Sequence, residues 1–205
     1  MTKVREDLVF DLDHIAIAAE NLDDGVAWVE DRLGVAMSGG GKHPAMGTHN
    51  RLLSLGDLYL EVISIDPDAA PPPYPRWFDL DSFSGLPRLT NWILRCPDLQ
   101  DGLAEMPAGT GVPMSLARGD LRWQMAVPGS GVLPLDGYAP ALITWQGPAH
   151  PAPLLPESGV RLVNLTVSHP GIARLPEIGD NRLALVAGAP GLRARFATPR
   201  GEVTL

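Results

Sequence analysis

Two segments of the chain repeat one short pattern, and this echo constrains the fold more than any other feature. Asn21 to Ala27 reads NLDDGVA and Asp98 to Ala104 reads DLQDGLA, so the two match position by position. Each begins with a residue type favoured as a helix N-cap and carries acidic residues in the first turn. The echo indicates duplication of one supersecondary unit, although a match this short can also arise by chance.

The first copy reads as a β-α-β-β-β unit. A strand is predicted over 13–18, where Ile15 and Ile17 alternate with smaller or polar residues. An amphipathic helix follows and ends at Gly34. Residues 51–55 and 58–65 read as two strands of a hairpin joined around Gly56-Asp57.

The pattern recurs downstream, and it predicts an α+β fold built from paired βαβββ modules. Strands over 90–96, 121–127 and 140–145 belong to the second copy. A shortened βαββ unit follows, with a strand over 160–168 and a closing hairpin at 199–201. We therefore expect a first module (1–66), a linker or lid (67–85), a second module (86–147), and a connector with a third, partial module (148–205).

Composition excludes several classes of protein. Apolar residues make up 45% and charged residues 20% of the chain, and no apolar run is long enough to cross a bilayer. The net charge is −8 and the arginines are scattered, so we expect no nucleic-acid or membrane partner. The N-terminus lacks the features of a secretory signal, which favours a cytoplasmic location. Cys96 is the only cysteine, so a thiolate zinc site is excluded, and a core role is expected for it.

Three motifs together resemble the vicinal oxygen chelate superfamily, which has the glyoxalase, bleomycin resistance and dioxygenase fold. They are Asp13-His14-Ile15-Ala16-Ile17, the helix start Asn21-Leu22-Asp23, and Tyr59-Leu60-Glu61-Val62-Ile63. The stretch 43–50 is similar to the glyoxalase-like branch of that superfamily. The resemblance implies curved mixed sheets around a cavity. It also implies a divalent metal (Zn, Mn, Fe or Ni) held by His14 on the first strand and Glu61 on the fourth.

The second copy departs from this pattern. Aligning the echo without gaps puts Asn91 where His14 stands, and the strand ending in Trp145 puts Thr144 where Glu61 stands. Neither an amide nor a hydroxyl is a good ligand for a transition metal. Half of the family's usual metal site is therefore missing.

His49 is a candidate third metal ligand, because two histidines and one carboxylate suit a divalent centre. The register of the hairpin argues against His49 as a ligand. If Gly56-Asp57 is a two-residue turn, Leu52 pairs with Glu61, Asn50 faces the cavity and His49 points away. A bulge would reverse this, so both orientations stay open.

Other candidates for the site follow from strand faces. Glu61 interrupts an apolar strand, so it needs a cation, a metal or hydrogen bonds, or else it pairs with Arg51 or lies on a solvated edge. It is the candidate catalytic residue. The candidate substrate-binding residues are Asn50, Arg95, Trp123 and Thr144. The alternatives are an exposed Arg95 or one paired with Glu61, and a core role for Trp123. His43 is expected in a surface loop, with closure over a ligand as the alternative.

Three functions remain open from the sequence. The first is a metal-assisted lyase, isomerase or dioxygenase acting on a small oxygenated metabolite. The second is a non-catalytic binding or sequestering protein of the drug-resistance type. The third is a metal-free catalyst with Glu61 as general base. A small molecule is the expected partner in all three, and a homodimer stays an open alternative.

Overall fold

The computed structural model describes residues 8–205. The prediction that the N-terminus lacks a secretory signal rests partly on residues 1–7, which lie outside the described residues. The first module contains β1 (Asp11–Ala18), α1 (Leu22–Leu33), β2 (Ser38–His43), β3 (Thr48–Ser54) and β4 (Tyr59–Ile65). The second contains β5 (Arg88–Arg95), α2 (Leu99–Glu105), β6 (Val112–Arg118), β7 (Leu121–Val127) and β8 (Ala141–Trp145). The third contains β9 (Arg161–Ser168), β10 (Leu183–Val186), β11 (Gly191–Thr198) and β12 (Gly201–Thr204), with the short helix η3 (Ile172–Arg174) after β9. Two more short helices lie between modules, η1 (Trp77–Asp79) and η2 (Ala152–Leu154).

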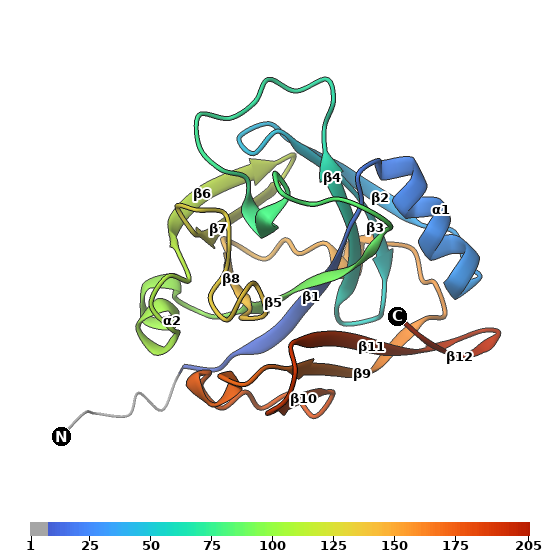
Figure 1. Cartoon of the computed structure of the whole chain (residues 1–205). Coiled ribbons are helices and arrows are strands. Elements are labelled where there is room, and N and C mark those ends of the chain that lie inside the picture. The colour runs from blue at the N-terminus through green and yellow to red at the C-terminus, as the bar shows by residue number, and fades with distance from the viewer. Residues whose placement is uncertain (1–7) are drawn as a thin grey trace.

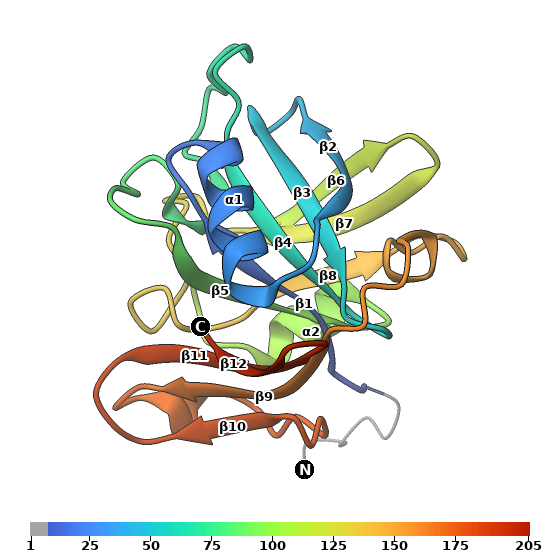
Figure 2. The same ribbon diagram turned by 90° about the vertical axis from the view of Figure 1, so that its right-hand side faces the viewer.

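The first two modules form one continuous curled sheet. Its eight strands run in the order β2-β3-β4-β1-β5-β8-β7-β6, and β1 and β5 pair antiparallel at the seam between modules. The sheet curls into a half-barrel, so that β2 and β6 approach each other across its open side (Figures 1 and 2). The predicted fold class of paired βαβββ modules around a concave face is confirmed.

Each module's helix covers the outer, convex face of its own strands. The Asn21 side chain accepts hydrogen bonds from the backbone N–H groups of Asp23 (2.9 Å) and Asp24 (3.3 Å), which fixes the start of α1. Gly34 ends the helix at φ 71°, a left-handed conformation that glycine adopts without steric cost. Asp98 caps α2 in the same way, through the N–H of Asp101. The two echoing segments are therefore two equivalent helix starts.

The two seam strands carry the same irregularity. In β1, Asp13 is an extra residue between the pairs Leu12–Leu94 and His14–Ile93. In β5, Thr90 is the extra residue between the pairs formed by Leu89 and Asn91. The offset that maps Asn21 onto Asp98 also maps Asp13 onto Thr90 and His14 onto Asn91. A β-bulge in each copy thus turns two consecutive side chains toward the concave face.

The third unit covers the convex face beside α1 and α2. It forms a separate sheet with the order β10-β9-β11-β12, which lies under β1 and β5 in Figure 1. Its buried residues share one hydrophobic cluster with the seam strands, including Leu12, Trp92, Leu162, Leu165 and Phe196. The third unit is therefore part of the main core rather than an appended domain.

A segment between β4 and β5 fills much of the concave face. Its short helix η1 inserts Trp77 and Phe78, which are 4% and 7% exposed, into a second hydrophobic cluster with Ile63, Ile93 and Trp123. This cluster and the polar side chains beside it make up the interior of the half-barrel. Within residues 8–205, no helix has the length and apolar character needed to cross a bilayer.

Candidate active site

A small polar cavity lies on the concave face where β1 and β4 run parallel. It has a volume of about 40 Å³. Its walls include His14, His43, Asn50, Glu61, Arg118 and Trp123. These side chains come from β1, β2, β3, β4, β6 and β7, so both modules contribute to it.

His14 is held by its neighbour Asp13. Strand alternation points His14 inward and the bulge places Asp13 on the same face, where His14 Nδ1 donates to Asp13 Oδ1 at 2.6 Å. Asp13 Oδ2 accepts from Trp145 Nε1 (2.9 Å) and His150 Nε2 (3.0 Å). Burial alone would raise the pKa of Asp13, but hydrogen bonds from His14 and His150 outweigh it and lower that pKa. Asp13 is thus a buried carboxylate that fixes the His14 tautomer and leaves Nε2 facing the cavity.

Tyr59 forms one wall beside His14. The two rings stack with centroids 4.4 Å apart and an interplanar angle of 10°. Burial raises the pKa of Tyr59 well above its ordinary value, and the nearby Asp13 and Glu61 carboxylates raise it further. Tyr59 therefore stays a neutral phenol, and its ring limits how far the His14 imidazole can turn.

Glu61 has one carboxylate oxygen engaged and one facing the cavity. Asn50 Nδ2 donates to Glu61 Oε1 at 2.5 Å, and Glu61 is 5% exposed. Glu61 Oε2 lies 3.6 Å from His14 Nε2, which is too long for a hydrogen bond. Asn50 therefore holds the carboxylate in place, and Oε2 keeps a lone pair available for a ligand.

Arg118 reaches across the open side of the half-barrel into the same network. Its Nη1 donates to Asn50 Oδ1 at 3.0 Å and to His43 Nε2 at 3.3 Å. Burial, together with the positive charge of Arg118, lowers the pKa of His43 to about 3. His43 is therefore neutral, and its Nδ1 donates to Thr48 Oγ1 at 3.1 Å. This arrangement places a guanidinium beside the cavity that contains Glu61.

The donor set does not fit a divalent metal held by three or more protein ligands. Of the described residues that line the cavity, His14 Nε2 and Glu61 Oε2 form the one pair of metal-ligand atoms that face each other at a suitable separation. Residues 8–205 contain no group of three or more His, Cys, Asp or Glu side chains arranged to hold a metal ion. The positive charge of Arg118 in the same network also opposes a second cation. Structural and catalytic sites for such metals ordinarily use at least three protein ligands.

The structure brings together four of the residues named from the sequence. His14, Asn50, Glu61 and Trp123 all line the cavity. The hairpin turn has two residues, because Leu52 pairs with Glu61 and Leu55 N donates to Leu58 O at 2.9 Å. This register is the one in which Asn50 faces the cavity.

His49, Arg95 and Thr144 lie elsewhere. His49 lines a separate depression beside the start of α1, with Asn21 and Pro67. Arg95 is partly exposed, and its Nε lies 3.5 Å from Asp11 Oδ2. The Thr144 hydroxyl donates to Cys96 O at 2.8 Å on the face that α2 covers. The alternative pairing of Glu61 with Arg51 is not seen, because no ion pair joins these two side chains within residues 8–205.

The register of β8 shows why Thr144 is not the counterpart of Glu61. Ala16 pairs with Glu61 in the first module. The offset between the copies maps Ala16 onto Ile93, and Ile93 pairs with Ala141. The position equivalent to Glu61 is therefore Ala141, three residues before the one expected from the sequence.

Several residues of the site were not expected from the sequence. His43 is 6% exposed at the end of β2, so the expected surface loop is wrong. Asp13 was hidden because strand parity puts it on the face opposite His14, and only the bulge reverses this. Arg118 and His150 lie far from the motif along the chain, and only closure of the half-barrel brings them close. No signal in the sequence pointed to Arg118, because the strand that it ends, β6, was not among the strands predicted for the second copy.

The chain is similar to one family model and to several solved structures. The family model described as a glyoxalase-like domain matches residues 12–180. A crystal structure of a hypothetical protein from Staphylococcus aureus has a TM-score of 0.53 and 11% identity, covering 96% of this chain and 84% of that chain. Methylmalonyl-CoA epimerase from Mycobacterium tuberculosis has a TM-score of 0.45 and 16% identity, covering 70% and 91%. No curated protein matches the chain.

The family match covers most of the chain, including both βαβββ modules and every residue that lines the cavity. The likeness to the staphylococcal protein extends over nearly all of the chain and supports the fold. The motif residues His14 and Glu61 lie side by side on the first and fourth strands, as the resemblance implies. The chain therefore belongs to the glyoxalase-like domain family, within the vicinal oxygen chelate superfamily.

Proposed function

We propose that the chain binds a small oxygenated acid with only its reacting carbon at the His14–Glu61 cavity, and that it catalyses proton transfer on this carbon without a metal. The observation that carries this proposal is the state of Glu61. Its Oε1 is held by Asn50, its Oε2 is open to the cavity, and a guanidinium lies in the same network. A positioned carboxylate beside a fixed positive charge suits removal of a proton from carbon next to a carbonyl group.

In the proposed reaction, Glu61 Oε2 takes a proton from the carbon adjacent to the substrate carbonyl. The electron pair of the broken C–H bond moves into the carbon–carbon bond and onto the carbonyl oxygen, which gives an enolate. Arg118 stabilises that negative charge, and Glu61 then returns a proton to carbon. His14 donates its Nδ1–H to Asp13, so its Nε2 is an acceptor and orients a hydroxyl group of the substrate. An isomerisation follows when the proton returns to a different face or atom.

The reaction is tested by isotope exchange with a minimal substrate. Wild-type protein treated with EDTA is incubated with 2-oxobutanoate in D₂O, and loss of the C3 proton signal is followed by NMR. We expect exchange above background, and a decrease of at least about 100-fold in Glu61→Gln, the size typical for loss of a general base. Glu105→Gln, at an exposed position on α2, is the matched control and should exchange like wild type.

Two results would contradict the proposal. One is exchange that disappears with EDTA and returns with Zn²⁺ or Mn²⁺, which would show that a metal is required. The other is an equal exchange rate in wild type and Glu61→Gln, which would show that Glu61 is not the base.

A sequestering function is the second candidate. It is favoured by the aromatic residues around the cavity, because Tyr59, Trp77, Trp123 and Trp145 all line it. In this case wild type and Glu61→Gln would bind small acids with similar affinity, and neither would catalyse exchange. The same experiment, with binding measured by calorimetry, separates the two functions.

A further inference from the structure

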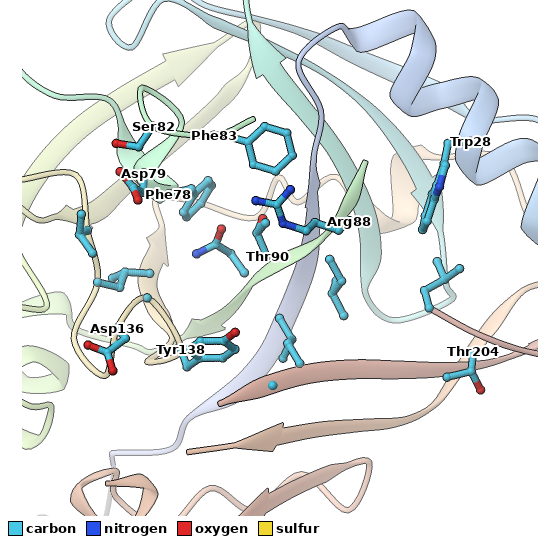
Figure 3. Close-up of a pocket in the computed structure, with 18 of the residues that line it drawn as sticks. Trp28, Phe78, Asp79, Ser82, Phe83, Arg88, Thr90, Asp136, Tyr138 and Thr204 are labelled. Atoms are coloured by element: carbon cyan, nitrogen blue, oxygen red, sulfur yellow. The ribbon is translucent and has the colours of Figure 1, made fainter. Parts of the chain in front are cut away.

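A groove much larger than the cavity lies on the other side of Phe78. Its volume is about 580 Å³, which is in the range of small-molecule sites. Its walls come from the start of β5, from the segment around η1, from residues 132–138, and from α1 and β11. Figure 3 shows Phe78, Phe83, Arg88 and Tyr138 around this space.

Asn91 is a buried polar side chain that lacks a partner in the groove. It is 3% exposed, and its Oδ1 has no hydrogen-bond partner within residues 8–205. An unpaired buried acceptor is costly, and such groups are rare in folded proteins. Asn91 lies at the position equivalent to His14, and strand alternation puts it on the same concave face as Ile93. A ligand with an N–H or O–H group would provide the missing donor.

Arg88 provides a positive charge on the same strand. Its guanidinium stacks on Phe83, 4.2 Å from the ring centroid, and Nη1 donates to Ser84 O at 2.8 Å. These contacts hold the guanidinium beside the groove, where it can bind a carboxylate. A ligand that suits this groove therefore carries two groups. It has an N–H or O–H donor for Asn91 and a carboxylate for Arg88.

Phe78 separates the groove from the cavity. It lines both spaces, and its backbone has φ 60°, a left-handed conformation that is strained for a phenylalanine. Asp79 beside it has φ 53°, and its N–H donates to Gly131 O at 3.0 Å, which helps to hold this backbone in place. Strained residues of this kind gather at ligand sites.

The sheet register gives the separation that a ligand must span. Ala16 pairs with Glu61 on one side and with Asn91 on the other. Glu61 and Asn91 therefore lie in one row across three strands, with Cα atoms roughly 10 Å apart from the usual strand spacing. Ala16, which lies between them, has a small side chain and belongs to the same hydrophobic cluster as Phe78.

We propose that the groove binds an N-acyl amino acid or a similar carboxylate joined through an amide. Its amide N–H donates to Asn91 Oδ1, its carboxylate binds Arg88, and its acyl end passes Phe78 toward Glu61. This proposal rests on the proposed function for the reach into the cavity. Binding in the groove stands without it.

The test uses three probes that differ by one group each. N-Hexanoylglycine carries both features, hexanoyloxyacetate replaces the amide N–H with an ester oxygen, and N-hexanoylglycinamide lacks the carboxylate. Calorimetry on the full chain should show that the ester and the carboxamide each bind about tenfold more weakly than N-hexanoylglycine. For the ester this is the loss expected for one hydrogen bond to the buried Asn91, and for the carboxamide it is the loss of a charge-assisted contact with Arg88.

Variants assign each preference to its residue. In Asn91→Leu, the preference for amide over ester should disappear, while the midpoint of urea unfolding rises because an unpaired buried oxygen has been removed. In Arg88→Gln, the preference for carboxylate over carboxamide should disappear. Arg174→Gln, at an exposed position outside the groove, should keep both preferences. A rise in stability together with a loss of binding in Asn91→Leu distinguishes a ligand site from a damaged fold.

The proposal is overturned if no probe binds, if wild type binds the amide and the ester equally, or if Asn91→Leu keeps the preference. The two proposals fail independently. Wild type that binds N-hexanoylglycine with both preferences but shows no exchange of 2-oxobutanoate contradicts the proposed function and leaves the groove site standing. Where exchange is detected, N-hexanoylglycine should compete with 2-oxobutanoate, and non-competitive behaviour would contradict the passage of the acyl end beyond Phe78.

Discussion

Buried ionisable side chains in the cavity are compatible with the fold because each has a hydrogen-bonding partner of suitable type. Asp13 accepts three hydrogen bonds, and Glu61 accepts one from Asn50. Arg118 donates to a neutral His43 and to the carbonyl end of Asn50. Unpaired, any of these groups would cost several kcal/mol to bury. The network therefore holds the side chains in one arrangement before any ligand arrives.

His43 makes stability depend on pH. Its pKa is lowered to about 3 in the folded protein, whereas the unfolded chain has the ordinary value of 6.5. Below about pH 6.5 the unfolded state takes up a proton that the folded state does not. Stability is therefore lost as the pH falls from 6.5 toward 3, by at most about 1.4 kcal/mol per pH unit from this group.

Between pH 6.5 and pH 4.5, the free energy of unfolding should decrease less in His43→Gln than in wild type. Urea titration at each pH measures this decrease. His49→Gln is the control, because the pKa of His49 is lowered by burial at a more exposed position and its contribution should be smaller. Equal pH dependence in wild type and His43→Gln would contradict the neutral state of His43.

Strand parity predicted the cavity residues that come from one module. It placed His14, Asn50 and Glu61 on a common face, because side chains alternate along a strand and a two-residue turn fixes the register. It did not predict Asp13, because a bulge adds a residue without any marker in the sequence. It did not predict Arg118 either, because contacts across the half-barrel depend on curvature of the whole sheet.

At the scale of the elements, the two helices use a glycine to approach the sheet closely. A Cβ atom on Gly25 would lie 2.6 Å from Val62 Cγ1, and one on Gly102 would lie 2.7 Å from Cys96 Sγ. These glycines occupy equivalent positions in the two echoing segments. The echo therefore records a shared helix-to-sheet contact, which supports duplication over a match by chance.

Gly25→Ala should destabilise the protein, although alanine ordinarily favours a helix by about 1 kcal/mol. The added methyl group would collide with Val62, and overpacking of this kind costs about 1–3 kcal/mol. Urea unfolding should therefore show a lower free energy for Gly25→Ala. The control is Ala27→Gly at an exposed position of the same helix, where glycine should be the destabilising residue by about 1 kcal/mol. A stabilised Gly25→Ala protein would show that the contact is looser than described.

The elements themselves were predicted well where their signals are local. The start and end of α1 and the hairpin at Gly56-Asp57 are confirmed, because capping residues and turn residues act within a few positions. The strand β10 was not predicted, since only its parallel pairing with β9 makes it a strand. The insertion of Trp77 and Phe78 into the concave face was also not predicted, because it depends on the shape of a distant surface.

At the scale of the whole molecule, the third unit and the seam strands share one core. Phe196 on β11 is fully buried in the same cluster as Leu12 and Trp92. A cooperative unit is defined by contacts of this kind rather than by position along the chain. The third unit should therefore not unfold separately.

Phe196→Ala should lower the free energy of unfolding by about 3–5 kcal/mol, the usual cost for removing a large aromatic side chain from a core. Urea unfolding followed by tryptophan fluorescence and by far-UV circular dichroism should give coincident transitions for wild type and the variant. Val186→Ala, at a partly exposed position on β10, is the control and should change stability little. Separate transitions would show that the third unit folds independently of the sheet.

The antiparallel seam between β1 and β5 resembles an interface between two copies of one chain. Each strand presents the same bulge to the other, and the pairs Leu12–Leu94 and Leu89–Ile17 are related by a two-fold exchange of the copies. Covalent linkage makes this pairing intramolecular, so dilution cannot separate the halves. A linked pair does not require the two halves to share one sequence. The first half has His14 and Glu61, and the second half has Asn91 and Ala141 at the matching positions.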